Sequence, residues 1–598
     1  MADTAEQSKL GDLPEWDLSD LYAGPDDPAI NVDMDEANAE AQAFEKDLKG
    51  KLDGLDGAEM AAALGRYEAM QDRLGRVGSY AQLLYAGNLT DPDIGRFAQS
   101  VQERLTDISS HLLFFALEIN KLDDTTFDKL LTSPALAHYV PWLKEARLFR
   151  PHQLSDEAEA MLHEMSVVGD AAWNRLFDET IAGLRFDIGG ESLTESEALD
   201  FLSSQDGDKR REAAKELARV FKANEKLFAL ITNTLAKSKA IDDGWRQFAR
   251  PISYRNLSNQ VEDEVVDALI AAVQAAYPKL SHRYYAMKAK WMGGEKLDWW
   301  DRNAPLPDDD DRQIPWDEAR ATVLGAYGDF APEMAEIAEG FFDRRWIDAP
   351  ARPGKAGGAF AHPTVPSAHP FVLLNYQGKT RDVMTLAHEL GHGVHQVLAA
   401  EQGPLLASTP LTLAETASVF GEQLTFRRLL NAETDAKRRR TILAAKVEDM
   451  LNTVVRQIAF CEFERRVHDA RRDGELTPEA IGDLWMSVQT ESLGPALVFD
   501  DDYRSYWSYI PHFIHSPFYV YAYAFGDCLV NALYAHYQEA EEGFQARFFE
   551  MLKAGGSKRH KELLAPFGLD ASDPGFWSKG LGIIAGFIDE LEAADAAA

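Results

Sequence analysis

The chain has few cysteines, no long apolar run and too few basic residues to balance its acidic ones. Its 598 residues include only two cysteines, Cys461 and Cys528, both in apolar, helix-like sequence. A disulfide framework is excluded, and two buried thiols in a reducing compartment are expected. No run of about 18 apolar residues occurs, so no membrane-spanning helix is expected. The start of the chain is polar and acidic and lacks the features of a secretory signal, so we expect a cytoplasmic protein.

Acidic residues outnumber basic ones. The sequence holds 98 Asp and Glu against 61 Lys and Arg, which gives a net charge of −37. Such a surface repels nucleic acids and anionic membranes, so neither is expected as a partner. The excess indicates a solvated acidic surface, or an acidic interior that favours cationic peptides. With 45% apolar residues the chain can fill a large core.

Helical patterns dominate the sequence. Apolar residues recur every three or four positions over residues 33–148 and 208–290, which predicts long helices and a mainly α fold. The segment GLRFDIGGESL predicts a short hairpin that turns at Gly189 and Gly190. Helical sequence resumes after this hairpin.

The stretch TLAHELGHGVHQVL contains the pattern H-E-x-x-H at His388, Glu389 and His392. Two histidines four positions apart on a helix lie within about 40° of each other, so both imidazoles can bind one metal ion. Glu389 lies about 100° round and can act on water beside the metal without being a ligand. The predicted apolar face of this helix consists of Val383, Leu386, Leu390, Val394 and Val397. A chance match to the motif is the alternative interpretation.

A second helix downstream offers a third ligand. Its start is predicted from Thr409 as the N-cap and Pro410 at the first helical position. An apolar stripe follows, and Glu415 and Glu422 share the face opposite to it. A carboxylate from Glu415 would complete a His2Glu site, which leaves one coordination place to water and is typical of catalytic zinc. The alternative for Glu415 is a solvated helix residue.

Two further polar side chains are expected around the metal ligands rather than among them. Glu422 is predicted to hydrogen-bond a ligand histidine. His395 stands about one turn beyond His392 on the same face. Because three protein ligands are already present, we place His395 in the surrounding shell.

The segment before the metal-binding helix is the clearest non-helical part of the second half. RPGKAGGAF is rich in glycine, and PFVLLNY has the composition of a strand. Neither glycine-rich phosphate-binding motif is present. Glycines allow another backbone to approach closely, so a sheet edge here can pair with an extended peptide. The predicted substrate-binding residues are Gly357, Gly358, Ala359 and Phe360.

Several stretches spread along the chain resemble the M3 family of zinc metallopeptidases, and within it the oligoendopeptidase F branch. They are HELGHGVHQ, LAETASVFGEQ, WDLSDLY, RPGKAGGAF, RQIAFCEFE, IPHF and FYVYAYAFG. The resemblance implies two helical lobes around a deep substrate cleft, with an edge strand beside the zinc-binding helix. We expect an N-terminal helical domain of residues 1–200 that covers the cleft, and a catalytic domain of residues 201–598.

The resemblance also assigns roles to an aromatic segment near the C-terminus. It implies that His512 and Tyr523 stabilise the oxyanion of the transition state, and His515 is the alternative to His512. On a helix that restarts after Ser516, Tyr519 would share a face with Tyr523, and Tyr521 would point into the core. In related members two tyrosines lie three positions apart, so Tyr519 is the weaker candidate.

Together these features predict a zinc endopeptidase with one Zn2+ per chain, held by His388, His392 and Glu415. Glu389 is the expected general base. The resemblance implies short unstructured oligopeptides as substrates. The alternatives are a zinc carboxypeptidase or dipeptidyl carboxypeptidase, and a non-catalytic peptide-binding protein with an idle metal site. The sequence carries no signal for a particular oligomeric state.

Overall fold

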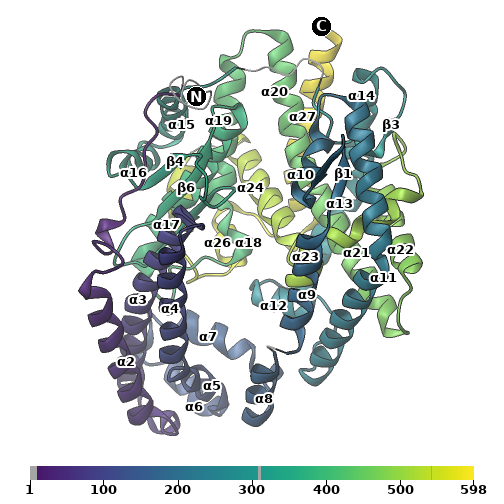
Figure 1. Ribbon diagram of the computed structural model, residues 1–598. Coiled ribbons are helices and arrows are strands. Elements are labelled where there is room, and N and C mark those ends of the chain that lie inside the picture. Colours follow the sequence, from purple (N-terminus) through teal and green to yellow (C-terminus); the bar gives the residue numbers. More distant parts are fainter. Residues whose placement is uncertain (1–9, 167, 307–311, 540–541, 598) are drawn as a thin grey trace. The chain divides into compact units, whose positions relative to one another are not determined.

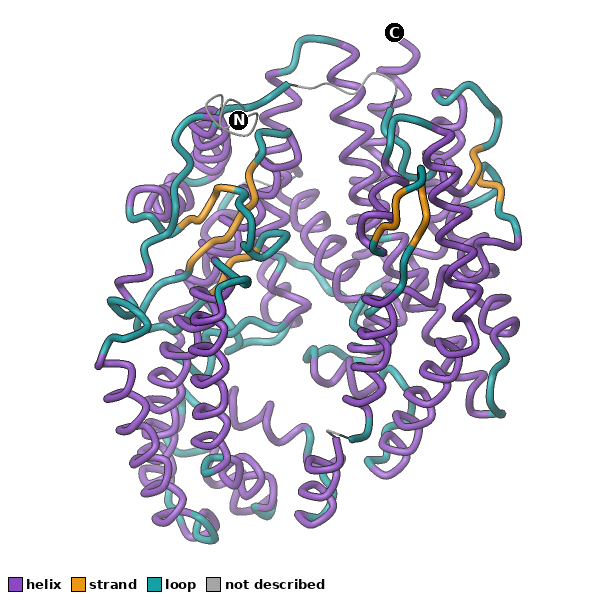
Figure 2. Tube along the Cα trace, viewed as in Figure 1, coloured by secondary structure: helices purple, strands orange, loops and turns teal. Residues whose placement is uncertain are grey.

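The computed structural model describes residues 10–166, 168–306, 312–539 and 542–597. Helices account for most of them, and the strands are few and short (Figure 1, Figure 2). The predicted mainly α fold is confirmed. Within these ranges no helix is both long and apolar enough to cross a membrane. Cys461 and Cys528 are free, buried thiols, as expected.

The chain folds into two compact units, each built from stretches that are distant in sequence. The first unit comprises Met1–Arg150, Asp311–Ala432 and His536–Leu569. The second comprises Pro151–Asp310, Glu433–Ala535 and Asp570–Ala598. The division into domains of residues 1–200 and 201–598 stays a prediction.

The first unit opens with long helices that begin at aspartate caps. Asp27, Asp56 and Asp91 each accept hydrogen bonds from N–H groups of the first turn that follows them. The helices of this part are α2 Pro28–Leu48, α3 Gly57–Gly87, α4 Pro92–Ser110, α5 Leu113–Lys121, α6 Asp124–Leu131 and α7 Val140–Leu148. The later helices are α15 Trp316–Phe330, α16 Pro332–Asp343, α17 Thr380–Ala399, α18 Leu411–Ala414, α19 Thr416–Ala432, α25 Phe544–Lys553 and α26 His560–Leu564.

A three-stranded sheet in the first unit supports helix α17. Its strand order is β4–β6–β5. β4 Ile347–Pro350 runs parallel to β6 Phe371–Tyr376, and β5 Phe360–His362 pairs antiparallel with the other side of β6. β6 is almost wholly buried, whereas β5 is a half-buried edge strand. Both β5 and β6 contact α17, so the small sheet predicted beside the metal-binding helix is confirmed.

The second unit contains the longest helix, α11 Gly207–Trp245, among the described residues. The predicted hairpin is present as β1 Phe186–Ile188 and β2 Glu191–Leu193, with its turn at Gly189 and Gly190. A short parallel bridge joins β3 Leu297–Asp298 to β7 Leu497–Val498. The other helices are α8 Asp156–Ser166, α9 Asp170–Gly183, α10 Glu195–Asp200, α12 Ser253–Ser258, α13 Asp263–Ala276, α14 Ser281–Trp291, α20 Ala436–Thr453, α21 Val455–Arg472, α22 Pro478–Leu493, α23 His512–His515, α24 Tyr521–Glu539 and α27 Pro574–Ala597.

Candidate metal centre and active site

Helix α17 separates an apolar face from a polar one, as its residue spacing predicts. The buried apolar side chains of its inner face are Val383, Leu386, Leu390 and Val394. Val397, predicted on the same face, is only half-buried. His388 and His392 point the other way and keep part of their surface accessible. The helix is therefore fixed by core packing while its two imidazoles stay free to bind.

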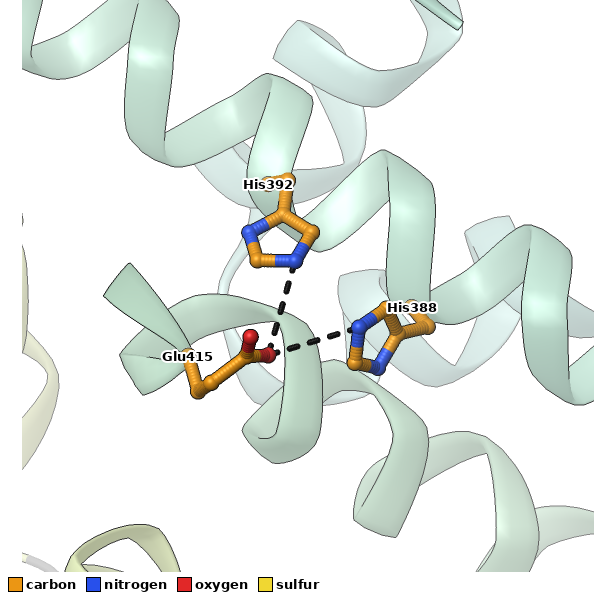
Figure 3. Close-up of side chains that lie close together, drawn as sticks. All are labelled: His388, His392 and Glu415. Atoms are coloured by element: carbon orange, nitrogen blue, oxygen red, sulfur yellow. Dashed lines mark ion pairs between the residues drawn. The ribbon is translucent and has the colours of Figure 1, made fainter. Parts of the chain in front are cut away.

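The two imidazoles meet the carboxylate of Glu415 (Figure 3). One oxygen, Oε2 of Glu415, lies 3.3 Å from Nε2 of His388 and 3.4 Å from Nε2 of His392. One ligand atom from each residue lies within 4.8 Å of the other two. Tetrahedral zinc with bonds of about 2.0–2.1 Å sets its ligand atoms about 3.3–3.4 Å apart. The donor set and its spacing thus suit a zinc ion.

Glu415 sits in a break between two helices rather than inside one. Its backbone φ of −76° and ψ of 0° close the four-residue helix α18, and α19 starts at the next residue. The hydroxyl of Ser418 donates to Oε2 of Glu415 at 2.7 Å. The predicted start of this helix was wrong. α18 begins at Leu411, and the hydroxyl of Thr409 contacts Nε2 of His395 instead of capping the helix.

Glu422 and His395 flank the ligands in different ways. Oε2 of Glu422 lies 3.3 Å from Nδ1 of His388, on the ring nitrogen that faces away from Glu415. A carboxylate in this position fixes the tautomer and orientation of a ligand histidine. His395 is buried, and its Nε2 lies 3.3 Å from the hydroxyl of Thr409. This contact joins α17 to the segment before α18, which ends at Glu415.

Glu389 is buried near His388 and Glu415, with 7% of its surface exposed. Burial raises the pKa of its carboxyl group to about 7, and the charge of Glu415 adds to this effect. His388 acts in the opposite direction, as does a hydrogen bond from the backbone N–H of Ala361. A carboxyl group with this pKa can both accept and release a proton near neutral pH.

The pKa values of His388 and His392 respond differently to the same buried surroundings. Burial lowers the pKa of His392 to about 4, although the carboxylate of Glu415 opposes the shift. Burial acts on His388 in the same direction, but Glu422 and Glu415 outweigh it and raise the pKa to about 9. Several carboxylates therefore surround one imidazole pair, which favours a cation between them.

Close packing of α17 against α19 depends on a glycine within the H-E-x-x-H segment. A Cβ at Gly391 would lie 2.5 Å from the carbonyl oxygen of Ala417 and 2.5 Å from Cα of Ser418. On the same helix, the carbonyl of Ala387 accepts a hydrogen bond from Tyr327 of α15. The packing role of Gly391 was not predicted, although a glycine inside a buried helix is a signal of close approach.

A buried lysine fixes the glycine-rich loop ahead of β5. Nζ of Lys355 donates to three backbone carbonyls of β4 and β6 and to the carboxylate of Asp348 at 3.0 Å. Nδ2 of Asn375 donates to the carbonyl of Gly358 at 2.8 Å. The four residues predicted to bind substrate lie in this loop or at the first position of β5: Gly357, Gly358, Ala359 and Phe360. Neither residue could be recognised from the sequence, because Lys355 bonds strands β4 and β6, and Asn375 of β6 bonds the loop carbonyls of Ala356 and Gly358.

The outer edge of β5 faces α17 rather than another strand. The carbonyl of Ala361 accepts a hydrogen bond from Nε2 of Gln396 at 3.2 Å. Its N–H also acts on the carboxylate of Glu389 and opposes the rise in its pKa. The edge strand and the H-E-x-x-H helix are thus linked through the backbone of one residue, Ala361.

In the second unit, three of the predicted residues gather. Nε2 of His512 and the hydroxyl of Tyr523 are 3.5 Å apart. The rings of Tyr519 and Tyr523 have centroids 5.3 Å apart. His515 turns elsewhere, with its Nε2 2.8 Å from the carboxylate of Asp178. The structure therefore groups His512, and not His515, with the tyrosines.

The helix that carries Tyr523 begins later than predicted. α24 starts at Tyr521, because Phe518 has a φ of 60°, which an α-helix does not allow. The N–H of Phe518 donates to Oε1 of Glu464 at 2.8 Å, which holds this turn. Tyr521 is fully buried, and its hydroxyl accepts a hydrogen bond from Nδ2 of Asn259 at 2.9 Å. The prediction that Tyr521 is the core residue is confirmed.

Comparisons with known proteins agree along the chain. Residues 201–583 match the description "Peptidase family M3", and residues 118–186 match "Oligopeptidase F". The sequence is 28% identical to Oligopeptidase PepF of Bacillus subtilis, over 95% of this chain and 87% of that protein. It is 27% identical to the Oligoendopeptidase F homolog of Borreliella burgdorferi, over 94% of this chain and 95% of that protein.

A solved structure shares the fold. The crystal structure of oligoendopeptidase-F from Enterococcus faecium matches with a TM-score of 0.71 at 22% sequence identity. The match covers 95% of this chain and 98% of that one. At this level of identity the likeness concerns the fold, and the family follows from the sequence matches.

Proposed function

Because the chain belongs to peptidase family M3, we propose that it is a zinc-dependent endopeptidase that hydrolyses internal bonds of short, unstructured oligopeptides. The names of its relatives, oligopeptidase and oligoendopeptidase F, support this class of substrate. The free thiols of Cys461 and Cys528 suit a reducing compartment, and we place the enzyme in the cytoplasm.

One observation carries the proposal: Oε2 of Glu415 lies 3.3 and 3.4 Å from the Nε2 atoms of His388 and His392, and the three possible ligand atoms all lie within 4.8 Å of one another. Three protein ligands leave one coordination place open, which distinguishes catalytic from structural zinc sites. When bound, zinc supplies a Lewis acid that activates water and polarises the scissile carbonyl. Glu422 holds the His388 ring in place through its second nitrogen.

Glu389 is the proposed general base and acid. Its carboxylate takes a proton from the attacking water and later gives it to the leaving amine. Burial suits this role because it keeps the carboxyl pKa close to neutral pH. The side chain is not among the three metal-binding residues, so it is free to move protons.

We assign oxyanion stabilisation to His512 and Tyr523, with Tyr519 beside them. Tyr523 offers a phenolic O–H and His512 a ring N–H, the kinds of donor that stabilise the negative oxygen of a tetrahedral intermediate. Each such donor contributes about 2.7–4 kcal/mol in other hydrolases. Their mutual contact supports a shared role.

We propose that the backbone of the peptide substrate binds along the outer edge of β5 and the loop before it, residues 357–360. An extended peptide would pair with this edge through main-chain hydrogen bonds. Lys355 and Asn375 hold the loop rigid without contacting the edge itself. A peptide that pairs with Ala361 would displace the side-chain amide of Gln396 from the carbonyl of this residue.

Product masses separate this proposal from an exopeptidase. We suggest incubating the protein with internally quenched peptides of 5 to about 20 residues and with a denatured protein. An endopeptidase of this kind cleaves the short peptides at internal bonds and leaves the long chain intact. Stepwise loss of one or two residues from the C-terminus would identify a carboxypeptidase or dipeptidyl carboxypeptidase instead.

Metal dependence is tested in the same assay. A chelator is expected to abolish cleavage, and stoichiometric Zn2+ to restore it. Peptide binding without any cleavage, with or without zinc, would support a peptide-binding protein with an idle metal site.

A further inference from the structure

A tight turn in the second unit leads directly into the helix that carries Tyr523. The N–H of Tyr519 donates to the carbonyl of Ser516 at 3.1 Å, and this hydrogen bond closes the turn. Pro517 at the second position and a positive φ at the third are the pattern of a type II turn. Glycine is the usual residue at that third position, but here it is the fully buried Phe518, with a φ of 60°. An aromatic residue keeps this conformation only where its surroundings enforce it.

Two ionisable side chains hold one peptide group of this turn from its two ends. The carbonyl of Pro517 accepts a hydrogen bond from Nε of Arg255 at 3.2 Å. The N–H of Phe518, at the other end of the same peptide group, donates to Oε1 of Glu464 at 2.8 Å. Arg255 comes from α12 and Glu464 from α21. A flip of this peptide group is the rotation that separates a type II turn from a type I turn, and it would break both hydrogen bonds. We call the two side chains the Arg255–Glu464 clamp.

The carboxyl group of Glu464 is buried for this one contact. The residue is 3% exposed, and across the residues that the structure describes its Oε2 has no hydrogen-bond partner. Within the same ranges, neither Glu464 nor Arg255 forms an ion pair with a residue of opposite charge. Burial of a carboxyl group for a single backbone N–H destabilises a protein. Such features persist where a function requires the conformation that they hold.

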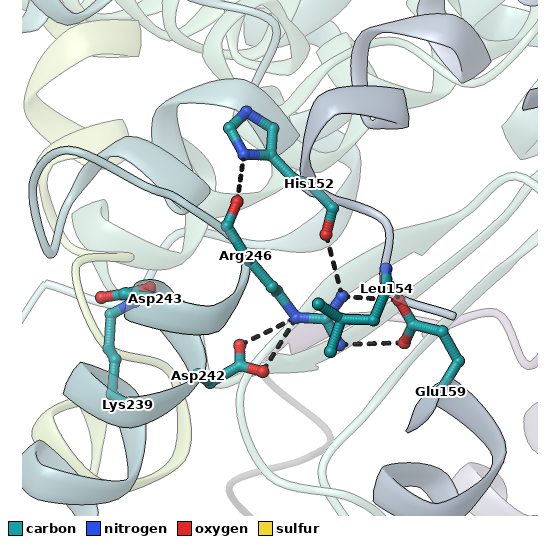
Figure 4. A network of polar contacts seen from close by, with 7 residues as sticks. All are labelled: His152, Leu154, Glu159, Lys239, Asp242, Asp243 and Arg246. Carbon is teal, nitrogen blue, oxygen red and sulfur yellow. Dashed lines mark hydrogen bonds and ion pairs between the residues drawn. The ribbon is translucent and has the colours of Figure 1, made fainter. Parts of the chain in front are cut away.

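The same unit contains a similar arrangement that holds a segment without proposed site residues (Figure 4). Nη1 of Arg246 donates to the carbonyl of His152 at 3.2 Å. Oε1 of Glu159 accepts a hydrogen bond from the N–H of Leu154 at 2.9 Å. Arg246 and Glu159 also form an ion pair with each other at 2.8 Å, so each charge is compensated. This pair is a structural control for the clamp.

The clamp reaches the side chains that the turn places beside His512. Cζ of Arg255 lies 5.9 Å from the centre of the Tyr519 ring, so the clamp contacts this side chain as well as the backbone before it. The centre of the Tyr519 ring is 6.1 Å from that of His512 and 5.3 Å from that of Tyr523. Nε2 of His512 and the hydroxyl of Tyr523 are 3.5 Å apart. Because all three rings are only half-buried, core packing alone does not fix them.

We propose that Arg255 and Glu464 are positioning residues for the reaction. By holding one peptide group of the turn, they keep Tyr519 and Tyr523 in the orientation beside His512 that oxyanion stabilisation requires. The proposal rests on the proposed peptidase function. Neither residue has to touch the substrate, because a misplacement of about 1 Å by a substitution far from the chemistry can lower the rate about 10²-fold.

Kinetics of Glu464 variants on internally quenched peptides test the clamp. Glu464→Leu removes the acceptor for the Phe518 N–H, so kcat should fall by about 10–10²-fold while KM changes by less than about twofold. Glu464→Gln keeps an oxygen for this N–H and should retain kcat within about threefold. Wild-type kcat in Glu464→Leu, or an equal loss in Glu464→Gln, would overturn the proposal.

Glu159→Leu is the matched control for lost stability. It removes the acceptor for the N–H of Leu154 and the ion pair with Arg246, so the Tm should fall while kcat stays unchanged. A loss of kcat as large as that of Glu464→Leu would show that both variants act through general destabilisation, which would contradict a positioning role.

A double-mutant cycle separates positioning from structural support. Adding Glu464→Leu to Tyr523→Phe should lower kcat by less than about threefold further, because the donor that the clamp positions is already absent. Losses that multiply fully would show that Glu464 does not act through Tyr523, and the proposal would fail.

Arg255 tests the clamp from its other side, with a residue that is only half-buried. Arg255→Met loses the bond to the Pro517 carbonyl and the charge near the Tyr519 ring, and it should lower kcat by about tenfold. Arg255→Lys keeps a cation and a donor and should recover part of this loss. Wild-type kcat in Arg255→Met would overturn the proposal, also in the case that Glu464→Leu does not fold. If the wild-type chain cleaves no peptide, the proposed function itself fails; if it cleaves them and both variants keep its kcat, only the positioning role fails.

Discussion

Glu389 meets two requirements of the role that we propose for it, a general base beside a metal ion. It is close enough to the ligands for its pKa to respond to His388 and Glu415. It is nevertheless outside the group of three side chains that can hold one ion. Its contact with the Ala361 N–H also links it to the edge strand assigned to the substrate. One residue thus connects the metal position with the proposed substrate position.

Replacing Glu389 with Gln removes the proton acceptor and keeps the shape of the side chain. We expect kcat to fall by at least about 10³-fold while one zinc per chain is retained, because general acid–base catalysis contributes about 10²–10⁴-fold. The checks are kcat on a quenched peptide and metal analysis of the same sample. Glu401→Gln, an exposed substitution of the same kind, is the control. Normal turnover in Glu389→Gln would refute its assigned role.

Removing the hydroxyl of Tyr523 tests oxyanion support. Tyr523→Phe is expected to lower kcat by about 10²–10³-fold and to change KM little, because the lost donor acts mainly in the transition state. Tyr521→Phe is the matched control: it loses the hydrogen bond from Asn259 and should lower the Tm without a comparable loss of kcat. Equal kcat values for the two variants would exclude Tyr523 from the chemistry.

At the residue scale, local geometry decides what the sequence can predict. His388 and His392 share a helix, so the approach of the two imidazoles could be predicted from their spacing. Glu415 closes helix α18 instead of lying inside a helix, so its approach to them depends on packing and not on helical phase. The role of Lys355 could not be predicted, because its partners lie on two different strands, β4 and β6, whose approach is decided by the folded sheet.

At the scale of helices, the metal site depends on how closely α17 and α19 approach. Gly391 of α17 meets the backbone of α19 within the turns that follow Glu415. Gly421 of α19 similarly leaves no room for a Cβ beside Tyr327 of α15. The three helices are therefore locked together by glycines, and the distance from Glu415 to the histidines is set by this packing.

Gly391→Ala should separate the two helices and weaken the metal site. We expect a loss of about 1–3 kcal/mol in the free energy of unfolding, because a Cβ at 2.5 Å from backbone atoms must displace α19. Zinc affinity should fall as well. Gly582→Ala in α27 is the control, since nothing lies within 4 Å of its added Cβ and alanine favours helix. Chemical unfolding and zinc titration are the measurements; a neutral Gly391→Ala would contradict the packing account.

Helix ends were the least predictable features of the elements. The Thr409–Pro410 signal predicted a start one position too early, because the hydroxyl of Thr409 bonds His395 across the structure instead of capping the helix. Phe518 interrupts the predicted helix before Tyr521 because its N–H is held by Glu464. In both cases a tertiary contact overrides a local signal.

At the scale of the whole molecule, each unit combines stretches that are hundreds of residues apart. The spacing of apolar residues predicted a mainly α fold, and the apolar fraction predicted a large core. Neither prediction depends on which stretches of the chain pack together. Which stretches associate is determined by long-range packing, for example of α17 on α25 in the first unit and of α20 on α27 in the second. Local sequence patterns therefore do not reveal which distant stretches pack together.

A buried carboxyl group makes the stability of the chain depend on pH. Glu464 is 3% exposed, and burial raises its pKa to about 8, although the N–H of Phe518 opposes this. In the unfolded chain the same group ionises near its ordinary pKa of 4.5. Between these values the folded state holds a proton that the unfolded state releases, so the free energy of unfolding falls as pH rises.

Glu464→Gln removes this titration while keeping an oxygen to accept the Phe518 N–H. Between pH 5.5 and 8 the wild type should lose about 3 kcal/mol more stability than the variant. Urea unfolding of both proteins across this range is the measurement. Parallel stability profiles would show that Glu464 is ionised in the folded state.

Zinc titration of the Glu415→Gln variant tests the central claim most directly, because it asks whether two helices hold one metal ion through three side chains. At a buffered free zinc concentration that loads the wild type with about one ion per chain, Glu415→Gln should remain largely empty, with an affinity lower by at least about 10²-fold. Glu389→Gln and Glu401→Gln should load fully. Wild-type zinc affinity in Glu415→Gln would contradict the account.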